Sequence, residues 1–324
     1  MHLQCVGIAV LCIVKTGTTI RHFYYTLTPE NPITMNDLVL MIGNDINNIS
    51  KGQSWQDLLQ EIIDFCQVCD AVALDNKKPF PLLYEEIFLT AIQKTHIKES
   101  TLKAFIAEKT LAIAPNPVHT AIRALQASDI LTTNYEFTLE GDIPAVNSSL
   151  INERFYSIFR KYQVNGTNYW HVHGDCLNPM SINLGFEHYG GQLQQMRNYV
   201  VSGTFYSNSK VPKASLLRRI KANQVHHHSW LDLFFTKDIH IFGLSLDFVE
   251  TDLWWLLTYR ARQKFQRNTV PVQNHIYYYI PEELTSMAKF KLDMLTANNV
   301  EVVSIKAKDK TAYYLSIIQK LARR

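Results

Sequence analysis

The chain has 324 residues, of which 47% are hydrophobic and 19% are charged, as is usual for a globular protein with a sizeable core. Its 32 basic and 29 acidic side chains give a formal net charge of only +3, which argues against direct binding of nucleic acid through a strongly basic face. The five scattered cysteines do not form a disulfide framework, so we expect a reducing, cytoplasmic location.

The N-terminal 36 residues are expected to form a β-hairpin extension. An apolar run at residues 6–14 is followed by the turn-like residues 15–18 and by a return segment at residues 19–27. The apolar run is too short to span a bilayer, and it lacks the basic segment and cleavage site of a signal peptide. We therefore expect no membrane association.

From residue 37 onwards, short apolar runs alternate with helical patterns. Strands are predicted at residues 37–42, 128–133, 169–173, 239–242, 275–280 and 300–305. Helical stretches are predicted at residues 54–125, 187–235, 250–266 and 282–298, and from residue 310. This alternation predicts an α/β domain over residues 37–324 with a doubly wound, mainly parallel, Rossmann-like sheet. The long stretch at about residues 54–125 is expected to be a helical insertion.

Four polar segments begin where predicted strands end. They are residues 43–45, 133–136, 173–175 and 243–245. Ligands of such sheets bind outside the carboxyl ends of the strands, so these segments are expected to meet at one rim. The dinucleotide fingerprint GxGxxG is absent, and the Gly-Asn-Asp turn at 43–45 is by itself typical of any tight turn or helix N-cap.

The segments LMIGNDIN (40–47), LTTNYE (131–136), HVHGD (171–175) and FGLSLDF (242–248) occur in this order. Together they resemble the sirtuin-like NAD-hydrolase domains of bacterial anti-phage defence systems. The similarity covers roughly residues 37–305, and LTTNY and the His-Gly pair are its specific parts. Two residues depart from the pattern: Glu136 stands where the family has aspartate, and Asp45 stands where relatives often have glycine.

The resemblance implies that Asn134 positions the nicotinamide ribose and the attacking water, and that His173 is a general base. The turn at 43–47 matches the pyrophosphate and ribose loop, and the turn at 243–245 matches the adenosine loop. The NAD contacts expected in this way are Gly43, Asn44, Asp45, Asn47, Thr133, Glu136, Gly243, Ser245 and Asp247. An asparagine amide both donates and accepts hydrogen bonds, and a neutral histidine can take a proton at cellular pH. NAD is the expected substrate, and this chemistry requires no metal.

Several residues have simpler interpretations. Asn134 could cap a helix, and Asp175 and Asp247 could be N-caps. His171 is expected to be a buried, hydrogen-bonded core residue. The run His226-His227-His228 fits a solvated loop better than a metal site, since no nearby ligand completes it. The CxxC pair Cys66 and Cys69 follows the helical spacing of core residues, so both cysteines are expected to be small core hydrophobes.

Three functions fit these patterns. The first is hydrolysis of NAD to nicotinamide and ADP-ribose, which depletes the cofactor in infected cells. The second is a non-catalytic subunit that binds NAD or ADP-ribose. The third is a protein deacylase, which the absence of a second CxxC pair for a zinc module makes the weakest. Because an uncontrolled NAD hydrolase would kill its host, a separate sensor protein or a homo-oligomer is expected to control the chain.

Overall fold

The computed structural model describes residues 9–16, 19–26, 37–49, 55–75, 77–266 and 271–323. The chain divides into two compact units, residues 1–35 and 36–324. In the first unit, β1 (Ala9–Thr16) and β2 (Thr19–Thr26) pair antiparallel, at the position of the predicted hairpin. Residues 6–8 of the predicted first strand, residues 17–18 of the turn and residue 27 lie outside the described residues.

The second unit is an α/β fold with a seven-stranded, mainly parallel sheet. Its order is β5-β6-β4-β3-β7-β8-β9, and only β5 runs antiparallel to its neighbour. The strands are β3 (Val39–Ile42), β4 (Asp129–Thr132), β5 (Lys161–Val164), β6 (Thr167–His171), β7 (Ile239–Phe242), β8 (Ile276–Pro281) and β9 (Val300–Ile305). The six strands predicted from the sequence are confirmed to within two residues at each end.

The sequence prediction missed the edge strand β5. Its four residues are largely polar, and only Tyr162 is fully buried, so the segment has no clear hydrophobic pattern. Asn165 and Gly166 connect β5 to β6 with positive φ angles of 50° and 88°. An Asn-Gly pair with two positive φ angles is the usual turn of a tight β-hairpin, and this dipeptide was the available signal.

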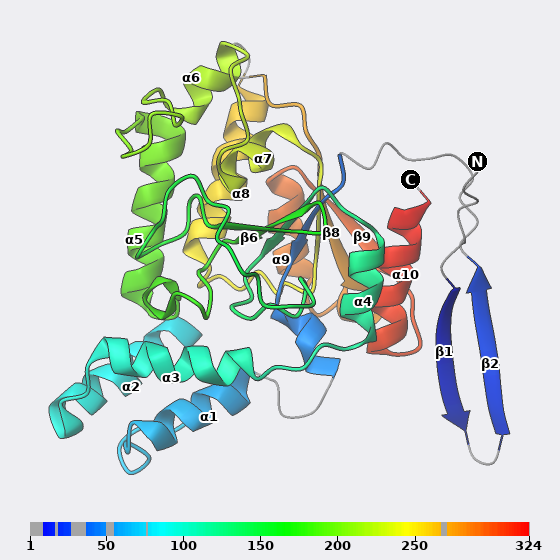
Figure 1. The fold of residues 1–324 in the computed structure, drawn as a ribbon, viewed down its shortest axis with the longest axis horizontal. Helices are drawn as coiled ribbons and strands as arrows, with labels where there is room; N and C mark the ends of the chain where they lie inside the picture. Colours follow the sequence, from blue (N-terminus) through cyan, green and yellow to red (C-terminus); the bar gives the residue numbers. More distant parts are fainter. Residues whose placement is uncertain are drawn as a thin grey trace. The chain divides into compact units, whose positions relative to one another are not determined.

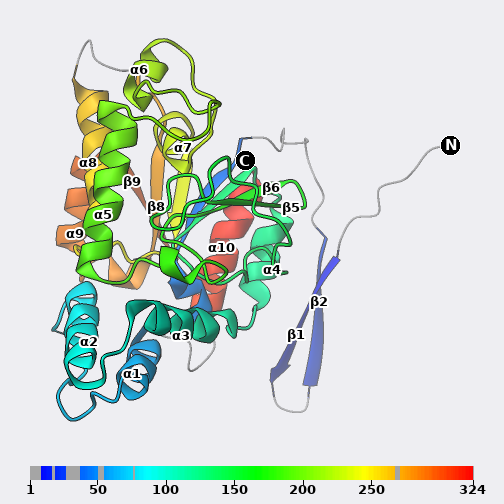
Figure 2. The same cartoon turned by 60° about the vertical axis from the view of Figure 1, so that its left-hand side comes forward.

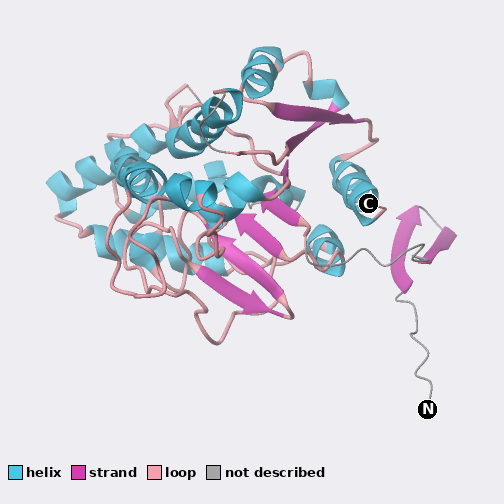
Figure 3. Ribbon diagram, turned by 90° about the horizontal axis from the view of Figure 1, so that it is seen from above, coloured by secondary structure: helices cyan, strands magenta, loops and turns pink. Residues whose placement is uncertain are grey.

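Helices cover both faces of the sheet because alternate side chains of each strand point to opposite sides. Val39 and Met41 pack with α5 (Phe186–Arg197), α6 (Leu216–Lys221), α7 (Trp230–Thr236), α8 (Thr251–Phe265) and α9 (Lys289–Ala297). Leu40 and Ile42 pack with α4 (Pro117–Ala124) and α10 (Lys310–Ala322). Figures 1 and 2 show α4 beside α10, away from α5 and α8, and Figure 3 shows helices on either side of the strands.

The predicted helical stretch at 54–125 divides into two parts with different packing. The first part, α1 (Trp55–Phe65), α2 (Phe80–Thr95) and α3 (Glu99–Leu111), forms its own core with segments that follow β4 and β6 (Figure 1). The second part, α4, belongs to the layer on the sheet. Cys66 is buried in the core of α1–α3, as predicted, but the prediction for Cys69 is wrong. Helix α1 ends at Phe65, and Cys69 lies exposed in the following turn.

Short 3-10 or π segments connect several of these elements. They are η1 (Asn44–Ile49), η2 (Pro179–Ser181), η3 (Asn198–Ser202) and η4 (Glu282–Leu284). Helix η1 starts directly after β3, so it replaces the α-helix that usually follows the first strand of such a sheet. Within the described ranges, no helix has the length and apolar character needed to cross a membrane.

Candidate functional site

The central strands end in register at one edge of the sheet. The paired positions at this edge are Ile42, Thr132, His171 and Phe242. Asn44, Asn134 and His173 each lie two residues beyond a paired position, in the connections that leave β3, β4 and β6. The convergence of the polar segments at one rim, predicted from the sequence, is therefore present in the fold.

Gly43 and Gly243 allow the turns after β3 and β7 to pack directly on each other. A Cβ atom on Gly43 would lie 2.5 Å from the carbonyl oxygen of Gly243 and 2.6 Å from Cα of Leu244. Gly243 has a φ of +66°, and its oxygen accepts a hydrogen bond of 2.9 Å from the backbone N–H of Asp45. Both positions require glycine because of this close approach and, at Gly243, the left-handed backbone.

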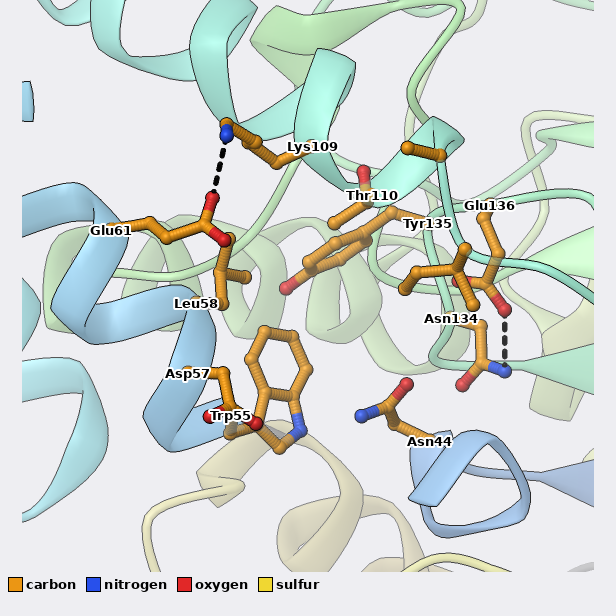
Figure 4. Close-up of a pocket in the computed structure, with 12 residues that line it drawn as sticks. Asn44, Trp55, Asp57, Leu58, Glu61, Lys109, Thr110, Asn134, Tyr135 and Glu136 are labelled. Carbon is orange, nitrogen blue, oxygen red and sulfur yellow. Dashed lines mark hydrogen bonds and ion pairs between the residues drawn. The ribbon is translucent and has the colours of Figure 1, made fainter. Parts of the chain in front are cut away.

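A cavity of about 260 Å³ opens between α1, the end of α3 and the turns that follow β3 and β4 (Figure 4). Three of the predicted contact residues, Asn44, Asn134 and Glu136, line it. The other lining residues are Trp55, Asp57, Leu58, Glu61, Lys109, Thr110, Ala112, Ile113 and Tyr135. The cavity thus combines a polar base from the sheet edge with an aromatic and charged wall from α1 and α3.

Glu136 organises the polar base of this cavity. Its Oε1 accepts hydrogen bonds from Nδ2 of Asn47 at 2.9 Å, from Nδ2 of Asn134 at 3.0 Å and from Oγ1 of Thr138 at 2.9 Å. Because a carboxylate only accepts, it fixes the NH₂ group of Asn134 on its own side. Among the described residues, the buried Oδ1 of Asn134 has no hydrogen-bond partner, and Figure 4 shows it on the side that faces Asn44. The site therefore presents an unused acceptor.

His119 holds the opposite end of this hydrogen-bond chain. Its Nδ1 accepts from the backbone N–H of Asn116 at 2.9 Å, so Nε2 carries the proton and donates to Oδ1 of Asn47 at 3.0 Å. Burial is the main cause that lowers the pKa of His119 to about 4, which keeps the ring neutral. The sequence analysis missed His119. Asn116 and Pro117 indicate the start of a helix, but no local pattern indicates that His119 contacts Asn47, 72 residues earlier in the chain.

His171 is the buried core histidine that the sequence predicts. It is fully buried, its Nδ1 donates to the carbonyl oxygen of Asn134 at 2.9 Å, and its Nε2 lies 2.9 Å from Oε1 of Glu140. Burial lowers the pKa of His171, but the charge and hydrogen bond of Glu140 raise it more, so the net shift is upward. His171 thus holds the loop that carries Asn134.

His173 forms a second buried histidine–carboxylate pair. Its Nε2 lies 2.8 Å from Oδ2 of Asp252, and the ring meets Tyr189 edge-on with centroids 5.2 Å apart. Burial lowers the pKa of His173, but the charge and hydrogen bond of Asp252 raise it more. Nearby, burial is the main cause that raises the pKa of Glu250 to about 7, and Asp252 adds to this rise. The sequence analysis missed Asp252 and Glu250, which belong to no local motif.

His173 lies outside the lining of the Asn134 cavity, but a short path of contacts joins the two. The Tyr135 ring lines the cavity, and its hydroxyl donates to the carbonyl oxygen of Asn183 at 2.5 Å. The backbone N–H of Asn183 in turn donates to the carbonyl oxygen of His173 at 2.9 Å. Through Asn183, Tyr135 therefore ties the loop that carries Asn134 to the segment that carries His173.

The remaining predicted contact residues lie away from the cavity. The carboxylate of Asp45 accepts from Nζ of Lys310 at 2.6 Å and from the Tyr314 hydroxyl, so its charge is directed towards α10. Thr133 is buried, and its backbone N–H donates to the carbonyl oxygen of Ile42 at 3.3 Å. The structure brings neither residue into the lining of the cavity.

Ser245 and Asp247 are exposed on the connection between β7 and α8. Nζ of Lys291 donates to the carbonyl oxygen of Ser245 at 2.8 Å and lies 3.4 Å from Oδ1 of Asp247. Asp247 does not cap α8 with its side chain. Asp175 accepts from the backbone N–H groups of Leu177 and Asn178 within a turn, but the following helical segment η2 has Asn178 as its N-cap, so the prediction that Asp175 is a helix N-cap is wrong.

The histidine run was predicted to be a solvated loop. His226 and His227 are exposed, and Nε2 of His227 lies 3.1 Å from Oγ1 of Thr236. In the part of the chain that the structure describes, no three His, Cys, Asp or Glu side chains are grouped so that they could hold a metal ion.

The chain matches no protein-family model and no curated protein. The interpretation of the site therefore depends on its own geometry. Among the described residues, that geometry offers an acceptor on Asn134 without a partner at the cavity, the buried His173–Asp252 pair, and a carboxyl group on Glu250 whose pKa is raised to about 7. These groups suit a reaction in which a hydroxyl or a water is oriented and then loses a proton.

Proposed function

We propose that the chain is an NAD⁺ glycohydrolase (NADase) built on a doubly wound, Rossmann-like, sirtuin-like fold. In the proposed reaction, water adds to C1′ of the nicotinamide ribose and the C1′–N bond breaks. The bonding electron pair leaves with nicotinamide, and ADP-ribose and one proton are the other products. The substrate is NAD, and the reaction as written needs no metal.

The oriented amide of Asn134 is the observation that carries this proposal. Glu136 holds its NH₂ group, so the atom offered to a ligand is the buried Oδ1, which has no partner in the described ranges of the chain. An acceptor in this position suits a ligand group that donates, such as a ribose hydroxyl or the attacking water. Holding that group in the reacting geometry is the main contribution that such an enzyme makes to the rate.

The charges around the cavity favour the nicotinamide half of NAD over its pyrophosphate. Among the described residues that line the cavity are three carboxylates, Asp57, Glu61 and Glu136, and one cation, Lys109, which lies 2.9 Å from Glu61. This acidic lining attracts the positively charged nicotinamide ring and repels phosphates. The volume of about 260 Å³ is slightly below the ~300 Å³ of small drug-sized sites. A cavity of this size also fits one half of NAD better than the whole molecule.

His173 is the proposed base for the proton that the water releases. Its carbonyl oxygen accepts from the backbone N–H of Asn183, whose own carbonyl oxygen accepts from the hydroxyl of the cavity residue Tyr135, so hydrogen bonds link His173 to the wall of the cavity. The Asp252 carboxylate beside it stabilises the imidazolium that forms when the proton is taken.

We further propose that the activity serves bacterial anti-phage defence in the cytoplasm by depleting NAD. Such an enzyme has to be silent in healthy cells, so a separate sensor protein or assembly into a homo-oligomer would control it. His173 is not among the residues that line the Asn134 cavity, which supports an enzyme whose site is completed only when a partner engages it.

The second candidate function is a non-catalytic subunit that binds NAD or ADP-ribose. One observation favours it: His173 lies outside the cavity that Asn134 lines, so the two predicted catalytic residues do not share one open site. A binding subunit would need the cavity but not the base.

Incubation of the purified chain with NAD and measurement of free nicotinamide tests the proposal, alone and with candidate partner proteins. We expect release from the unaltered chain once an activating partner or assembly engages it, and loss of that release in Asn134→Ala. Asn298→Ala is the matched control, because Asn298 precedes β9 at the opposite, amino edge of the sheet. Calorimetric binding of ADP-ribose without any nicotinamide release would support the binding subunit and contradict the hydrolase.

A further inference from the structure

Asp252 is buried in an unusual way for an acidic residue. It is the second residue of α8, its side chain is fully buried, and its Oδ2 lies 2.8 Å from Nε2 of His173. Among the described residues, its Oδ1 has no hydrogen-bond partner and no Lys or Arg forms an ion pair with it. A buried charge of this kind costs several kcal/mol unless a partner compensates it.

We propose that Asp252 is the positioning residue of His173: it accepts the hydrogen bond from Nε2–H and leaves Nδ1 as the ring nitrogen that takes a proton. This inference rests on the proposed hydrolase only for the identity of the reaction. The pairing itself is a property of the chain without any ligand.

The hydrogen-bond pattern decides which nitrogen is available. An ionised carboxylate only accepts, so Nε2 of His173 carries a hydrogen. Nδ1 has no hydrogen-bond partner in the described parts of the chain, in contrast to Nδ1 of His171, which is bonded to the carbonyl oxygen of Asn134. The neutral His173 ring is therefore held in the tautomer whose lone pair is on Nδ1.

The fold supplies two features that stabilise the Asp252 carboxylate in this position. It lies in the first turn of α8, where the unpaired backbone N–H groups and the helix dipole favour a negative charge. The second feature is His173 itself, which becomes a cation when Nδ1 takes the proton. Proton uptake by His173 thus turns an uncompensated buried charge into a buried ion pair, which is the arrangement that a base needs.

Other ionisable groups around this pair also influence its titration. Glu250 lies just before α8, Tyr189 on α5 contacts the His173 ring, and Tyr135 and Asp247 lie nearby in their connections. Glu250 matters most for an experiment, because burial raises its pKa to about 7 and it can contribute to the same range of pH. A Glu250→Gln variant is therefore needed to separate the two groups.

The first test uses the full chain without NAD. Nuclear magnetic resonance of the imidazole nitrogens gives the tautomer of His173 and the pH at which it titrates. We expect the Nε2–H tautomer and, in Asp252→Asn, a titration midpoint lower by about one pH unit or more, because the neighbouring charge is removed. Asp293→Asn, which removes an exposed acid from α9, is the matched control and should leave His173 unchanged.

The second test measures nicotinamide release against pH. Asp252→Asn should lower kcat by roughly 100-fold, the lower end of the usual contribution of a general base, with little change in KM. The acidic limb of its pH profile should move in the same direction as the midpoint of His173. Asp252→Glu, which keeps the charge, should recover part of kcat, and Asp293→Asn should match the unaltered chain.

An unchanged His173 midpoint in Asp252→Asn would overturn the inference, and so would a lower midpoint with an unchanged pH profile. The inference would also be overturned if the acidic limb of the pH profile moved in Glu250→Gln but not in Asp252→Asn. That result would assign the titration to Glu250. If the unaltered chain released no nicotinamide either alone or with any candidate partner, the proposed hydrolase would fail, and the titration of His173 would by itself decide whether Asp252 positions this ring.

Discussion

His171 and His173 stand two residues apart, and both are buried beside a carboxylate. His171 pairs with Glu140 and His173 with Asp252, and none of the four side chains is more than 2% exposed. The difference lies in the other ring nitrogen. Nδ1 of His171 is bonded to the carbonyl oxygen of Asn134, whereas Nδ1 of His173 has no partner among the described residues.

This difference separates a structural histidine from one that is available for chemistry. His171 belongs to β6 and has both nitrogens engaged, so it can only fix the loop of Asn134. His173 lies beyond the strand end, where the backbone leaves the sheet and the ring can meet groups from α5 and α8. Burial and a carboxylate partner are thus insufficient to identify a base, and the hydrogen bonds of both nitrogens have to be counted.

The largest effect on stability is expected from His171→Ala. This change leaves Glu140 buried without its partner and releases the carbonyl oxygen of Asn134. We expect the free energy of unfolding to fall by about 3–5 kcal/mol, as is usual when one member of a buried pair is removed. Denaturant unfolding measures this loss. A loss below about 1 kcal/mol would show that the His171 pair contributes little to stability.

His173→Gln should affect activity more than stability. Glutamine keeps an N–H donor for Asp252 but cannot act as a base, so nicotinamide release should fall by roughly 100-fold, equivalent to about 2.7 kcal/mol. The free energy of unfolding should change by less than in His171→Ala. Kinetic and unfolding measurements on both variants sharpen the comparison. Similar losses of stability in the two would remove the distinction between the histidines.

His119 extends the comparison to a buried histidine without a carboxylate partner. Burial is the main cause that lowers its pKa to about 4, so the folded chain resists a proton that the unfolded chain binds near pH 6.5. Its contribution to stability is complete above pH 6.5 and is lost as the pH falls towards 4. Between pH 7 and pH 5 we expect a loss of about 2 kcal/mol from this group.

Unfolding of the unaltered chain and of His119→Gln at both pH values measures the contribution of His119. For each protein, the fall in the free energy of unfolding from pH 7 to pH 5 is measured. We expect this fall to be larger in the unaltered chain than in His119→Gln. Equal losses would mean that His119 is not held neutral in the folded chain.

The smallest effect is expected from the half-exposed ion pair between Asp45 and Lys310. Its side chains are 47% and 38% exposed, so solvent screens their attraction. Lys310→Ala should lower the free energy of unfolding by less than about 1 kcal/mol. A much larger loss would mean that the bonds from α10 to Asp45 hold η1, and with it Asn44 and Asn47, in place.

Much of the fold was predictable from local patterns. Each of the six predicted strands is a short apolar run that ends at a polar or glycine-containing segment, and buried parallel strands have this composition. The edge strand β5 was missed because its outer side chains face solvent and carry no hydrophobic signal. The different packing of α1–α3 and α4 was also hidden, since all four are amphipathic or apolar helices within one continuous stretch.

The candidate site was predictable only where its residues follow strand ends. Asn44, Asn134 and Glu136 were identified in this way, because parallel strands bring their carboxyl ends to one edge. Position after a strand end also led to the prediction that Asp45, Ser245 and Asp247 contact the ligand. This position does not determine the direction in which a side chain points. Lys310 and Lys291 engage these residues from elements that come much later in the chain.

By itself, the sequence determined the order of strands and helices and which polar segments meet at the rim, because periodicity and turn residues act over a few positions. The tertiary structure decided which atoms of those segments are free. Glu136, Asn47 and His119 orient the amide of Asn134, and Asp252 holds Nε2 of His173. Among the described residues, Oδ1 of Asn134 and Nδ1 of His173 then have no partner. The contacts of His119 and Asp252 span 72 and 79 residues, so their directions are fixed only when the helices pack on the sheet.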